Sequence, residues 1–340
     1  MTRLHQVLSG AGPYDAVTTQ AFAWRELLGE RAGGIHAEAI DPRVRGVDPL
    51  ERLEPAADDV LVFHYSAYAP RLRRLLELPQ RKLLVYHNVT PPRYLWRHHP
   101  LVAVQCSLGR AQLPTYARAA DVAAAVSGYN AAELESAGAR DVRVVPIILD
   151  PARLDSGGGR AAAGPLVLCV GRLVPNKRHD LVLAAFDAWR RAHAPDAELL
   201  CVGEPLGEAY RELLEGLAGD GVTFAGGLRQ EELNAAYRRA DVLISLSEHE
   251  GFCVPLLEAF HFGVPVVARP AGGMREVGGD AVLWTDDPDP ALVAELLELA
   301  VRDGGLRAEL VRRGRARLDE FAPERVADRV REAVDAVVAA

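Results

Sequence analysis

The chain has 340 residues, of which 49% are hydrophobic and 25% charged, and its formal net charge is −8. This is the composition of an ordinary globular protein, and the acidic balance argues against a general nucleic-acid binder, which is normally basic. The length favours two domains. No run of 18 apolar residues and no signal-peptide core are present, and the four cysteines form no C-x-x-C pair. We therefore expect a reduced, cytoplasmic protein without a membrane span.

The first half of the chain alternates short apolar runs with helical patterns. The run "LHQVLS" is followed by a helical pattern from about Asp15 to Arg31. Further strands are predicted at residues 59–66, 82–88, 121–127 and 142–149. Such alternation is typical of a parallel sheet with helices on both faces.

The stretch "DSGGGRAAAG", residues 155–164, interrupts this alternation and predicts a flexible linker. Beyond it the pattern restarts, with strands predicted at 165–171, 197–203, 222–226, 241–246, 264–268 and 281–284. An amphipathic helix begins near Pro323. The chain is therefore expected to hold two doubly wound α/β domains, residues 1–154 and 165–321, with ligands at the carboxyl ends of the strands and a cleft between the domains.

The glycine-rich loop "SGAGPYD" after the first strand matches the dinucleotide-binding fingerprint poorly. Gly10 and Gly12 give G-x-G, but the third glycine of the fingerprint falls on Asp15. An aspartate at a helix N-cap would repel a pyrophosphate. No G-x-x-x-x-G-K-[ST] sequence occurs, so a P-loop is excluded.

The loop "VGRLVPNK" follows the first strand of the second domain. Gly171 frees the backbone at the strand end, and Arg172 and Lys177 bring two cations to the carboxyl edge of the sheet. Such cations are suited to neutralise a diphosphate. Taken alone, Arg172 and Lys177 would be interpreted more simply as two surface cations in a loop. The prediction of a diphosphate site therefore depends on a second loop.

That second loop is "SEHEGFCVPLLEAF", in which Glu250 precedes a helix and Glu258 lies one turn inside it. Acidic residues at a helix start are often no more than favourable partners of the helix dipole. Here the helix start at Gly251–Leu257 also offers backbone N–H donors to phosphate. Carboxylates beside a bound diphosphate are tolerated when they accept hydrogen bonds from hydroxyls, Glu258 from a ribose and Glu250 from an attached sugar. The pattern predicts a nucleotide-sugar site.

These motifs, E-G-F-x-x-P-x-x-E followed by G-V-P-V-V-A and preceded by G-R-L-x-x-x-K, resemble the retaining glycosyltransferases of family 4 (group 1), of bacterial type. The resemblance implies the GT-B fold, two Rossmann-like domains with parallel sheets facing across a cleft, and a last helix (about 322–340) that packs back on the first domain. It assigns the diphosphate to Arg172 and Lys177, the ribose to Glu258 and the donor sugar to Glu250. The remaining donor contacts implied are Gly171, Gly226, Leu228, Gly251, Phe252, Cys253, Val254 and Leu256.

The resemblance also implies the chemistry. A hexosyltransferase-type enzyme would transfer a sugar from a nucleotide diphosphate to an acceptor hydroxyl, with retention of anomeric configuration by a front-face route. Glu250, Arg172, Lys177 and His87 would be its catalytic set. No metal or other cofactor is implied, since the cations and the helix dipole stabilise the leaving diphosphate. We expect a monomer or a dimer.

In the first domain, the resemblance places a donor-sugar histidine at His87, at the end of the strand 82–88, and His64 is the alternative. In the family's first loop, only Gly12 and Asp15 are candidate donor contacts here. The aromatic and basic residues Tyr94, Trp96 and Arg97 are candidates for acceptor binding, in preference to a peripheral membrane contact through the basic segment 71–78.

Two other functions remain open on the sequence. One is a non-catalytic protein that binds a nucleotide sugar without turnover. The other is a sugar-nucleotide epimerase of the same double-domain fold, which would need acid and base carboxylates and no acceptor.

Overall fold

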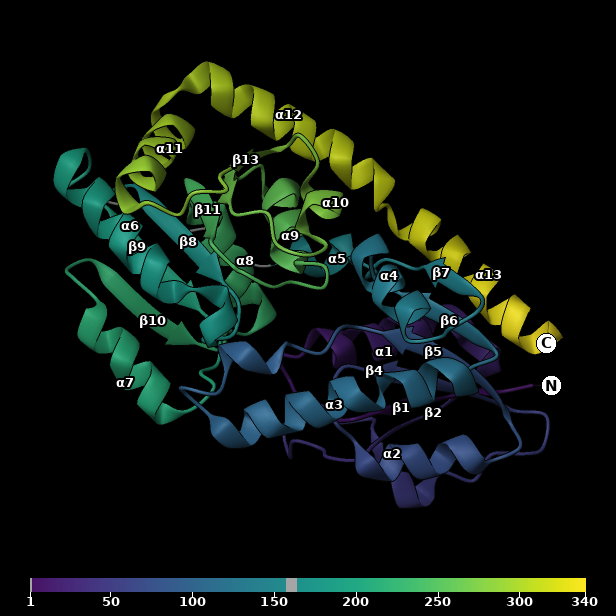
Figure 1. The fold of residues 1–340 in the computed structure, drawn as a ribbon. Coiled ribbons are helices and arrows are strands. Elements are labelled where there is room, and N and C mark those ends of the chain that lie inside the picture. The colour runs from purple at the N-terminus through teal and green to yellow at the C-terminus, as the bar shows by residue number, and fades with distance from the viewer. Residues whose placement is uncertain (1, 157–163) are drawn as a thin grey trace. The chain divides into compact units, whose positions relative to one another are not determined.

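The computed structural model describes residues 2–156 and 164–340, which form two compact units (Figure 1). The first unit comprises the chain up to Arg93, Leu101–Ile148 and Ala322–Ala340. The second comprises Tyr94–Pro100 and Leu149–Phe321. Most of the predicted linker 155–164 lies outside the described residues.

The first unit is built on a seven-stranded parallel sheet of order β3-β2-β1-β4-β5-β6-β7. Its strands are β1 (Leu4–Leu8), β2 (Ala32–Ala37), β3 (Asp48–Pro49), β4 (Val60–Tyr65), β5 (Arg81–Tyr86), β6 (Val122–Ala125) and β7 (Val142–Val144). The sequence prediction missed β2 and β3. Gly33, Gly34 and His36 interrupt the apolar pattern expected of a strand in β2, and β3 is only two residues long. The strand predicted at 142–149 ends at Val144, shortly before Pro146.

Alternate residues of these strands point to opposite faces of the sheet. Val60 and Val62 pack with Trp24 of α1 and with Val330 and Val334 of α13. The opposite face of the same strands packs on α3 and α4 through residues that include Leu61, Phe63, Tyr116 and Leu134. The helices are α1 (Ala16–Leu28), α2 (Pro70–Arg74), α3 (Pro100–Ala119), α4 (Gly128–Ser136) and α13 (Pro323–Ala339).

The basic segment 71–78 does not form one continuous helix. It is divided between α2 and a 3-10 turn at Leu75–Glu77. Across the described ranges, no helix combines the length and hydrophobicity needed to cross a bilayer.

The second unit is built on a six-stranded parallel sheet of order β10-β9-β8-β11-β12-β13. Its strands are β8 (Leu166–Val170), β9 (Glu198–Val202), β10 (Val222–Gly226), β11 (Val242–Ser245), β12 (Val266–Ala268) and β13 (Val282–Trp284). All six were predicted from the sequence. The helices are α5 (Pro151–Leu154), α6 (His179–Ala192), α7 (Glu208–Leu217), α8 (Gln230–Arg239), α9 (Val254–Phe262), α10 (Met274–Gly278), α11 (Pro290–Arg302) and α12 (Gly304–Glu320).

The strand order of each unit has a switch point, where the chain leaves the first strand in one direction and later returns to its other side. In the second unit this point lies between β8 and β11, and in the first between β1 and β4. Loops at the carboxyl ends of such strand pairs diverge and leave room for a ligand. The predicted fold class, two doubly wound Rossmann-like units, is confirmed.

Candidate functional site

The two candidate loops of the second unit follow β8 and β11, the strands that flank its switch point. Asn176, which is buried, ties them together: its side chain donates to the His249 carbonyl at 3.1 Å, and its own carbonyl accepts from Glu248 N at 2.8 Å. These bonds hold Lys177 beside Glu250. Sequence reasoning did not select Asn176, because its partners lie more than 70 residues away.

Lys177 and Glu250 form an ion pair, and the Ser247 hydroxyl donates to the same carboxylate oxygen, Oε1, at 2.8 Å. Burial by itself lowers the pKa of Lys177, but the charge and the hydrogen bond of Glu250, together with Cys253 and Cys169, outweigh it and raise that pKa, so the amine stays protonated. Glu250 Oε2 accepts no hydrogen bond from any residue that the structure describes. One carboxylate oxygen is thus occupied and the other is available to a ligand.

Arg172 differs from Lys177. Its side chain is exposed, and it has no ion pair or hydrogen bond within residues 2–156 and 164–340. The loop backbone is closely packed at this point. Gly203 at the end of β9 has φ +152°, and a Cβ there would lie 2.1 Å from the Gly171 carbonyl oxygen. Only glycine fits that approach.

Helix α9 begins directly after Glu250. Cys253 is its N-cap, in the left-handed region with φ 76°, and Gly263 ends the helix with φ 67°. Pro255 lies in the first turn, as the sequence predicted. Phe252 is buried against Phe321, with ring centroids 5.6 Å apart. Pro255 has no N–H and Leu256 N donates to the Cys253 carbonyl at 3.2 Å, so the N–H groups of Cys253 and Val254 are the donors that the start of this helix offers beside the Lys177–Glu250 pair.

Glu258 lies on α9, and its Oε2 accepts a hydrogen bond from the Tyr237 hydroxyl at 2.7 Å. Burial raises the pKa of Glu258, an effect that the Tyr237 bond and Arg153 only partly offset. Tyr237 is itself buried and stacks on Phe262 at 5.3 Å. Glu258 Oε1 accepts no hydrogen bond from the part of the chain that the structure describes. Sequence reasoning missed Tyr237, although a buried phenol must find a polar partner.

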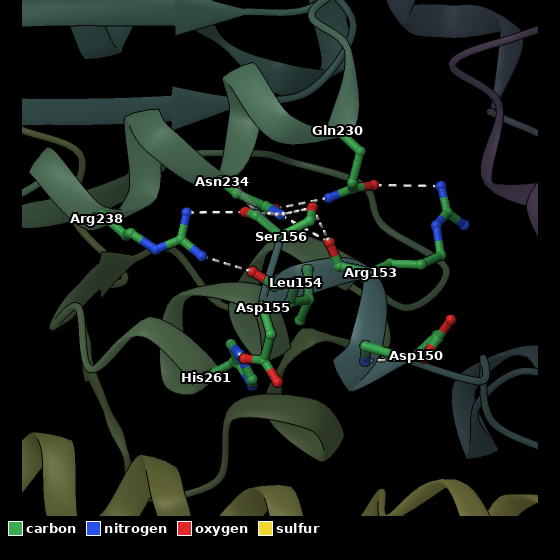
Figure 2. Close-up of polar contacts among 10 residues, drawn as sticks. Asp150, Arg153, Leu154, Asp155, Ser156, Gln230, Asn234, Arg238 and His261 are labelled. Carbon is green, nitrogen blue, oxygen red and sulfur yellow. Dashed lines mark hydrogen bonds and ion pairs between the residues drawn. The ribbon is translucent and has the colours of Figure 1, made fainter. Parts of the chain in front are cut away.

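Residues 153–156, which include the first two residues of the predicted linker, are bound to the helices that carry Tyr237 and Glu258. Asn234 on α8 is fully buried and donates to the carbonyls of Arg153 at 2.7 Å and Ser156 at 3.1 Å (Figure 2). Arg238 donates to the carbonyls of Ser156 and Leu154, and His261 on α9 pairs with Asp155. Residues up to Ser156 are thereby fixed to the second unit.

Two of the donor contacts that the resemblance implies, Gly226 and Leu228, lie at or just after the end of β10. Gly226 is its last residue, with φ 68°, and its carbonyl accepts from Gly203 N at 2.8 Å. Leu228 follows in the loop that leads to α8. Leu256, another predicted contact, is fully buried within α9, and Val254 opens that helix.

In the first unit, His87 lies just past the carboxyl end of β5 and contacts His64 of β4. His64 Nδ1 and His87 Nε2 are 2.9 Å apart, and His64 Nε2 lies 2.8 Å from Gln6 Oε1. The two candidate histidines therefore belong to one hydrogen-bonded cluster. Sequence reasoning missed Gln6, which reads as an ordinary strand residue.

Asp15 is the N-cap of α1, as predicted. Its carboxylate accepts from Thr18 N at 2.9 Å and from the Thr18 hydroxyl at 2.7 Å, and that hydroxyl accepts from Gly12 N at 3.1 Å. Both residues expected to contact a donor are thus engaged in the cap. No three His, Cys, Asp or Glu side chains gather into a metal site in the described parts of the chain.

The candidate acceptor loop is placed differently from the expectation. Tyr94–Pro100 group with the second unit, whereas the predicted boundaries put them in residues 1–154. The Tyr94 hydroxyl donates to the Glu248 carbonyl at 3.3 Å, and its ring lies 6.2 Å from that of His249. Trp96 is 49% exposed, and Arg97 is exposed. The loop is bound to the unit that holds the Lys177–Glu250 pair.

Similar proteins share both the sequence features and the fold. Residues 156–317 match the family described as "Glycosyl transferases group 1". The D-inositol 3-phosphate glycosyltransferase of Salinispora arenicola is 34% identical over 194 residues, which are 54% of this chain and 43% of that protein. The sulfoquinovosyl transferase SQD2 of Arabidopsis thaliana is 30% identical over 258 residues, 70% of this chain and 47% of that protein. The chain thus spans less than half of these relatives.

Two solved structures share the fold over almost the whole chain. HepE of Anabaena, in complex with UDP-glucose, superposes with a TM-score of 0.73 at 16% identity, covering 98% of this chain and 99% of that one. A sucrose-phosphate synthase of Thermosynechococcus elongatus gives a TM-score of 0.75 at 18% identity and covers 99% of both chains. Residues 156–317 therefore match the glycosyl transferases group 1 family, and the chain as a whole has the GT-B fold.

Proposed function

We propose that the protein is a retaining, metal-independent glycosyltransferase that moves a sugar from a nucleotide diphosphate to an acceptor hydroxyl. The observation that supports it most is the convergence of Lys177, Glu250 and the first turn of α9 at the β8/β11 switch point. This arrangement brings together a cation, a carboxylate and backbone donors, although Lys177 and Glu250 are 73 residues apart in the sequence. Glu258 and Tyr237 add a second polar site on the same helix.

The diphosphate is assigned to Arg172, Lys177 and the N-terminus of α9. The diphosphate is negatively charged, and Arg172 is available to form an ion pair with it, because its side chain is exposed and has no partner among the described residues. Lys177 has three N–H donors, of which the contact with Glu250 uses one, so it can also bind phosphate, while Glu250 Oε2 still needs a hydrogen-bond donor. Hydroxyls of the attached sugar provide one, since a hydroxyl donates to Glu250 without adding negative charge.

The nucleoside is assigned to Glu258 and the end of β10. Glu258 Oε1 is available to accept from the ribose hydroxyls while Tyr237 holds Oε2. The backbone at Gly226–Leu228 is the candidate contact for the base. The loops around the base, rather than one side chain, determine which base is bound.

In the transfer step, the acceptor oxygen forms a bond to the anomeric carbon as the bond from that carbon to the diphosphate oxygen breaks. The acceptor proton passes to the leaving diphosphate, on the same face of the sugar, so the configuration is retained. Arg172, Lys177 and the α9 N–H groups stabilise the charge that develops on the leaving group. His87 remains a candidate contact for a sugar.

The first test is calorimetric titration with UDP, GDP, ADP and dTDP in the presence of EDTA. We expect micromolar binding of one nucleotide, at least tenfold weaker in Lys177→Ala, whereas the control Arg191→Ala, which removes an exposed cation in the last turn of α6, binds normally. HepE makes UDP the first nucleotide to try. Absence of binding by all four would contradict the proposed site.

Turnover separates the candidate functions that share this site. Release of nucleotide diphosphate that depends on an added acceptor supports the transferase. Conversion of the nucleotide sugar without acceptor would favour an epimerase. Binding without either reaction, over a broad acceptor panel, would favour a non-catalytic protein. Retention is read from the anomeric configuration of the product by NMR.

A further inference from the structure

Two buried polar side chains and one partly buried side chain form a line across neighbouring strands of the first unit. Gln6 lies on β1, His64 on β4 and His87 just after β5. Gln6 and His64 are 1% and 0% exposed, and the Trp24 ring meets His64 edge-on at 5.5 Å. Water does not compete for these hydrogen bonds, so each donor must meet an acceptor within the protein.

The orientation of the Gln6 amide is fixed by a backbone carbonyl. Gln6 Nε2 donates to Ala21 O at 2.8 Å. A carbonyl oxygen only accepts, so the amide nitrogen must face Ala21 and the amide oxygen must face His64. Gln6 Oε1 likewise only accepts. His64 Nε2, 2.8 Å away, must therefore carry a proton.

Both imidazoles are neutral near pH 7. Burial lowers the pKa of His64 well below its usual value, with a further contribution from His87, and burial lowers the pKa of His87 to about 4. With its one proton on Nε2, His64 has a lone pair on Nδ1. The facing atom, His87 Nε2 at 2.9 Å, must then be the donor. The single proton of His87 is thus on Nε2.

This arrangement leaves His87 Nδ1 as a hydrogen-bond acceptor. The atom is buried and has no partner in the described part of the chain. A buried acceptor without a donor is destabilising, and a bound molecule that supplies a donor would remove that cost. A hydroxyl satisfies the requirement, whereas a carbonyl, a carboxylate or an unprotonated phosphate oxygen does not.

We propose that Gln6 and His64 are positioning residues that hold His87 in the Nε2–H tautomer, so that His87 Nδ1 accepts a hydrogen bond from a hydroxyl of a bound sugar. The sugar belongs either to the donor or to the acceptor. Its identity as a sugar rests on the proposed function, but the proton positions follow from the first unit alone. Neither Gln6 nor His64 needs to touch the ligand.

The proton positions are read from the 340-residue chain labelled with ¹⁵N-histidine, using long-range ¹H–¹⁵N correlation spectra. The variants His64→Asn and His87→Asn assign the two rings by loss of their signals. We expect both rings in the free protein to be neutral and protonated on Nε2. A proton on Nδ1 of His87, or a doubly protonated ring at pH 7, would overturn the proposal whether or not any nucleotide sugar binds.

Substitutions of Gln6 test whether it controls the tautomer. We expect Gln6→Leu to shift or broaden the ring signals of His64 and His87, because His64 Nε2–H loses its acceptor. Gln20→Leu is the matched control. Gln20 is also buried and exchanges two hydrogen bonds with Ile148, at 2.8 and 2.9 Å, but contacts neither histidine. Unchanged histidine signals in Gln6→Leu would rule out the positioning role.

A conservative variant keeps the test valid if Gln6→Leu does not fold. Gln6→Glu retains an oxygen that accepts from His64 Nε2–H, so we expect both rings to keep the Nε2–H tautomer. A different tautomer of His87 in Gln6→Glu would count against the proposal.

The ligand is tested with UDP-glucose, GDP-mannose and free glucose, against UDP and GDP as controls. We expect the Nδ1 resonance of His87 to move when a sugar hydroxyl donates to it, and not with the nucleotides alone. A shift with a nucleotide sugar alone assigns the donor, and a shift with free glucose assigns an acceptor position. If none of the three sugars moves this resonance, the hydroxyl contact is wrong, even where calorimetry shows nucleotide binding.

Discussion

The Tyr237 hydroxyl donates a 2.7 Å hydrogen bond to Glu258 Oε2, from one helix of the second unit to the next. The bond occupies one oxygen of a buried carboxylate and fixes the direction of the other. Glu258 was expected from the sequence to contact a ribose, and Tyr237 now gives that carboxylate a defined orientation. The bond therefore couples a residue outside the sequence motifs to the proposed nucleotide site.

Removing the phenol should weaken nucleotide binding. We expect Tyr237→Phe to lower affinity about fivefold, since a hydrogen bond to a charged group is worth about 1 kcal/mol or more. The loss should be smaller for the 2′,3′-dideoxynucleotide, which offers no ribose hydroxyls to Glu258. Tyr116→Phe, which removes a buried phenol bonded to Ala69 O in the first unit, is the control. Equal losses in both variants, measured by calorimetry, would exclude the coupling.

Glu258 should make the protein less stable as the pH rises. Its pKa is raised by burial above the ordinary 4.5, so the folded state favours the neutral acid. The stability that this confers is complete below the unfolded pKa and is lost as pH rises through the folded pKa. We expect Glu258→Gln to melt at a higher temperature than the native protein at pH 7 and at the same temperature at pH 4.

Thermal unfolding of both proteins between pH 4 and pH 8 checks this expectation. Glu208→Gln, an exposed carboxylate at the start of α7, should leave the difference near zero at every pH. A melting temperature of Glu258→Gln that stays equal to the native value at pH 7 would show that the buried carboxylate is not a source of instability.

Breaking the Lys177–Glu250 pair should be costly from either side. A buried charge left without its partner destabilises by several kcal/mol in general, and we expect about 1–3 kcal/mol for Lys177→Met or Glu250→Gln, whose side chains retain some solvent contact. The double variant should lose less than the sum of the two single variants. Chemical denaturation of all four proteins gives the coupling free energy, and strict additivity would mean that the pair is not formed in solution.

Asn234 should determine how firmly residues 153–156 are held. We expect Asn234→Ala to expose the backbone after Arg153 and to increase trypsin cleavage there, since two carbonyls lose their donor. Asn130→Ala is the matched control, because Asn130 is likewise fully buried but lies in the first unit. Cleavage at Arg153 that rises equally in the two variants would point to general loss of stability.

The sequence was informative where chemistry is encoded by local spacing. Gly171, Lys177, Glu250 and Glu258 stand in two short motifs next to strands, and the structure brings Lys177 and Glu250 together as an ion pair. Alternation of apolar runs was sufficient to predict all six strands of the second sheet. The strand β2 was missed because two glycines and a histidine replace most of its apolar residues.

What the sequence could not show is pairing over long separations. Tyr237 with Glu258, Asn176 with His249 and Gln6 with His64 are separated by 21, 73 and 58 residues. Each of these partners is a common residue in an ordinary helix, loop or strand. Their roles come from strand order and side-chain direction, which tertiary packing decides.

The first unit is completed by α13, which is synthesised only after all of the second unit. Residues 149–321 of the second unit are all present before α13 is made, whereas the first sheet needs Val330 and Val334 of that helix to cover Val60 and Val62. A nascent chain therefore exposes an apolar face of its earliest strands throughout translation of everything that follows. The N-terminal unit, made first, should be the last to reach its native packing, and a ribosome-bound chain that stops at residue 321 should bind chaperones through that uncovered face.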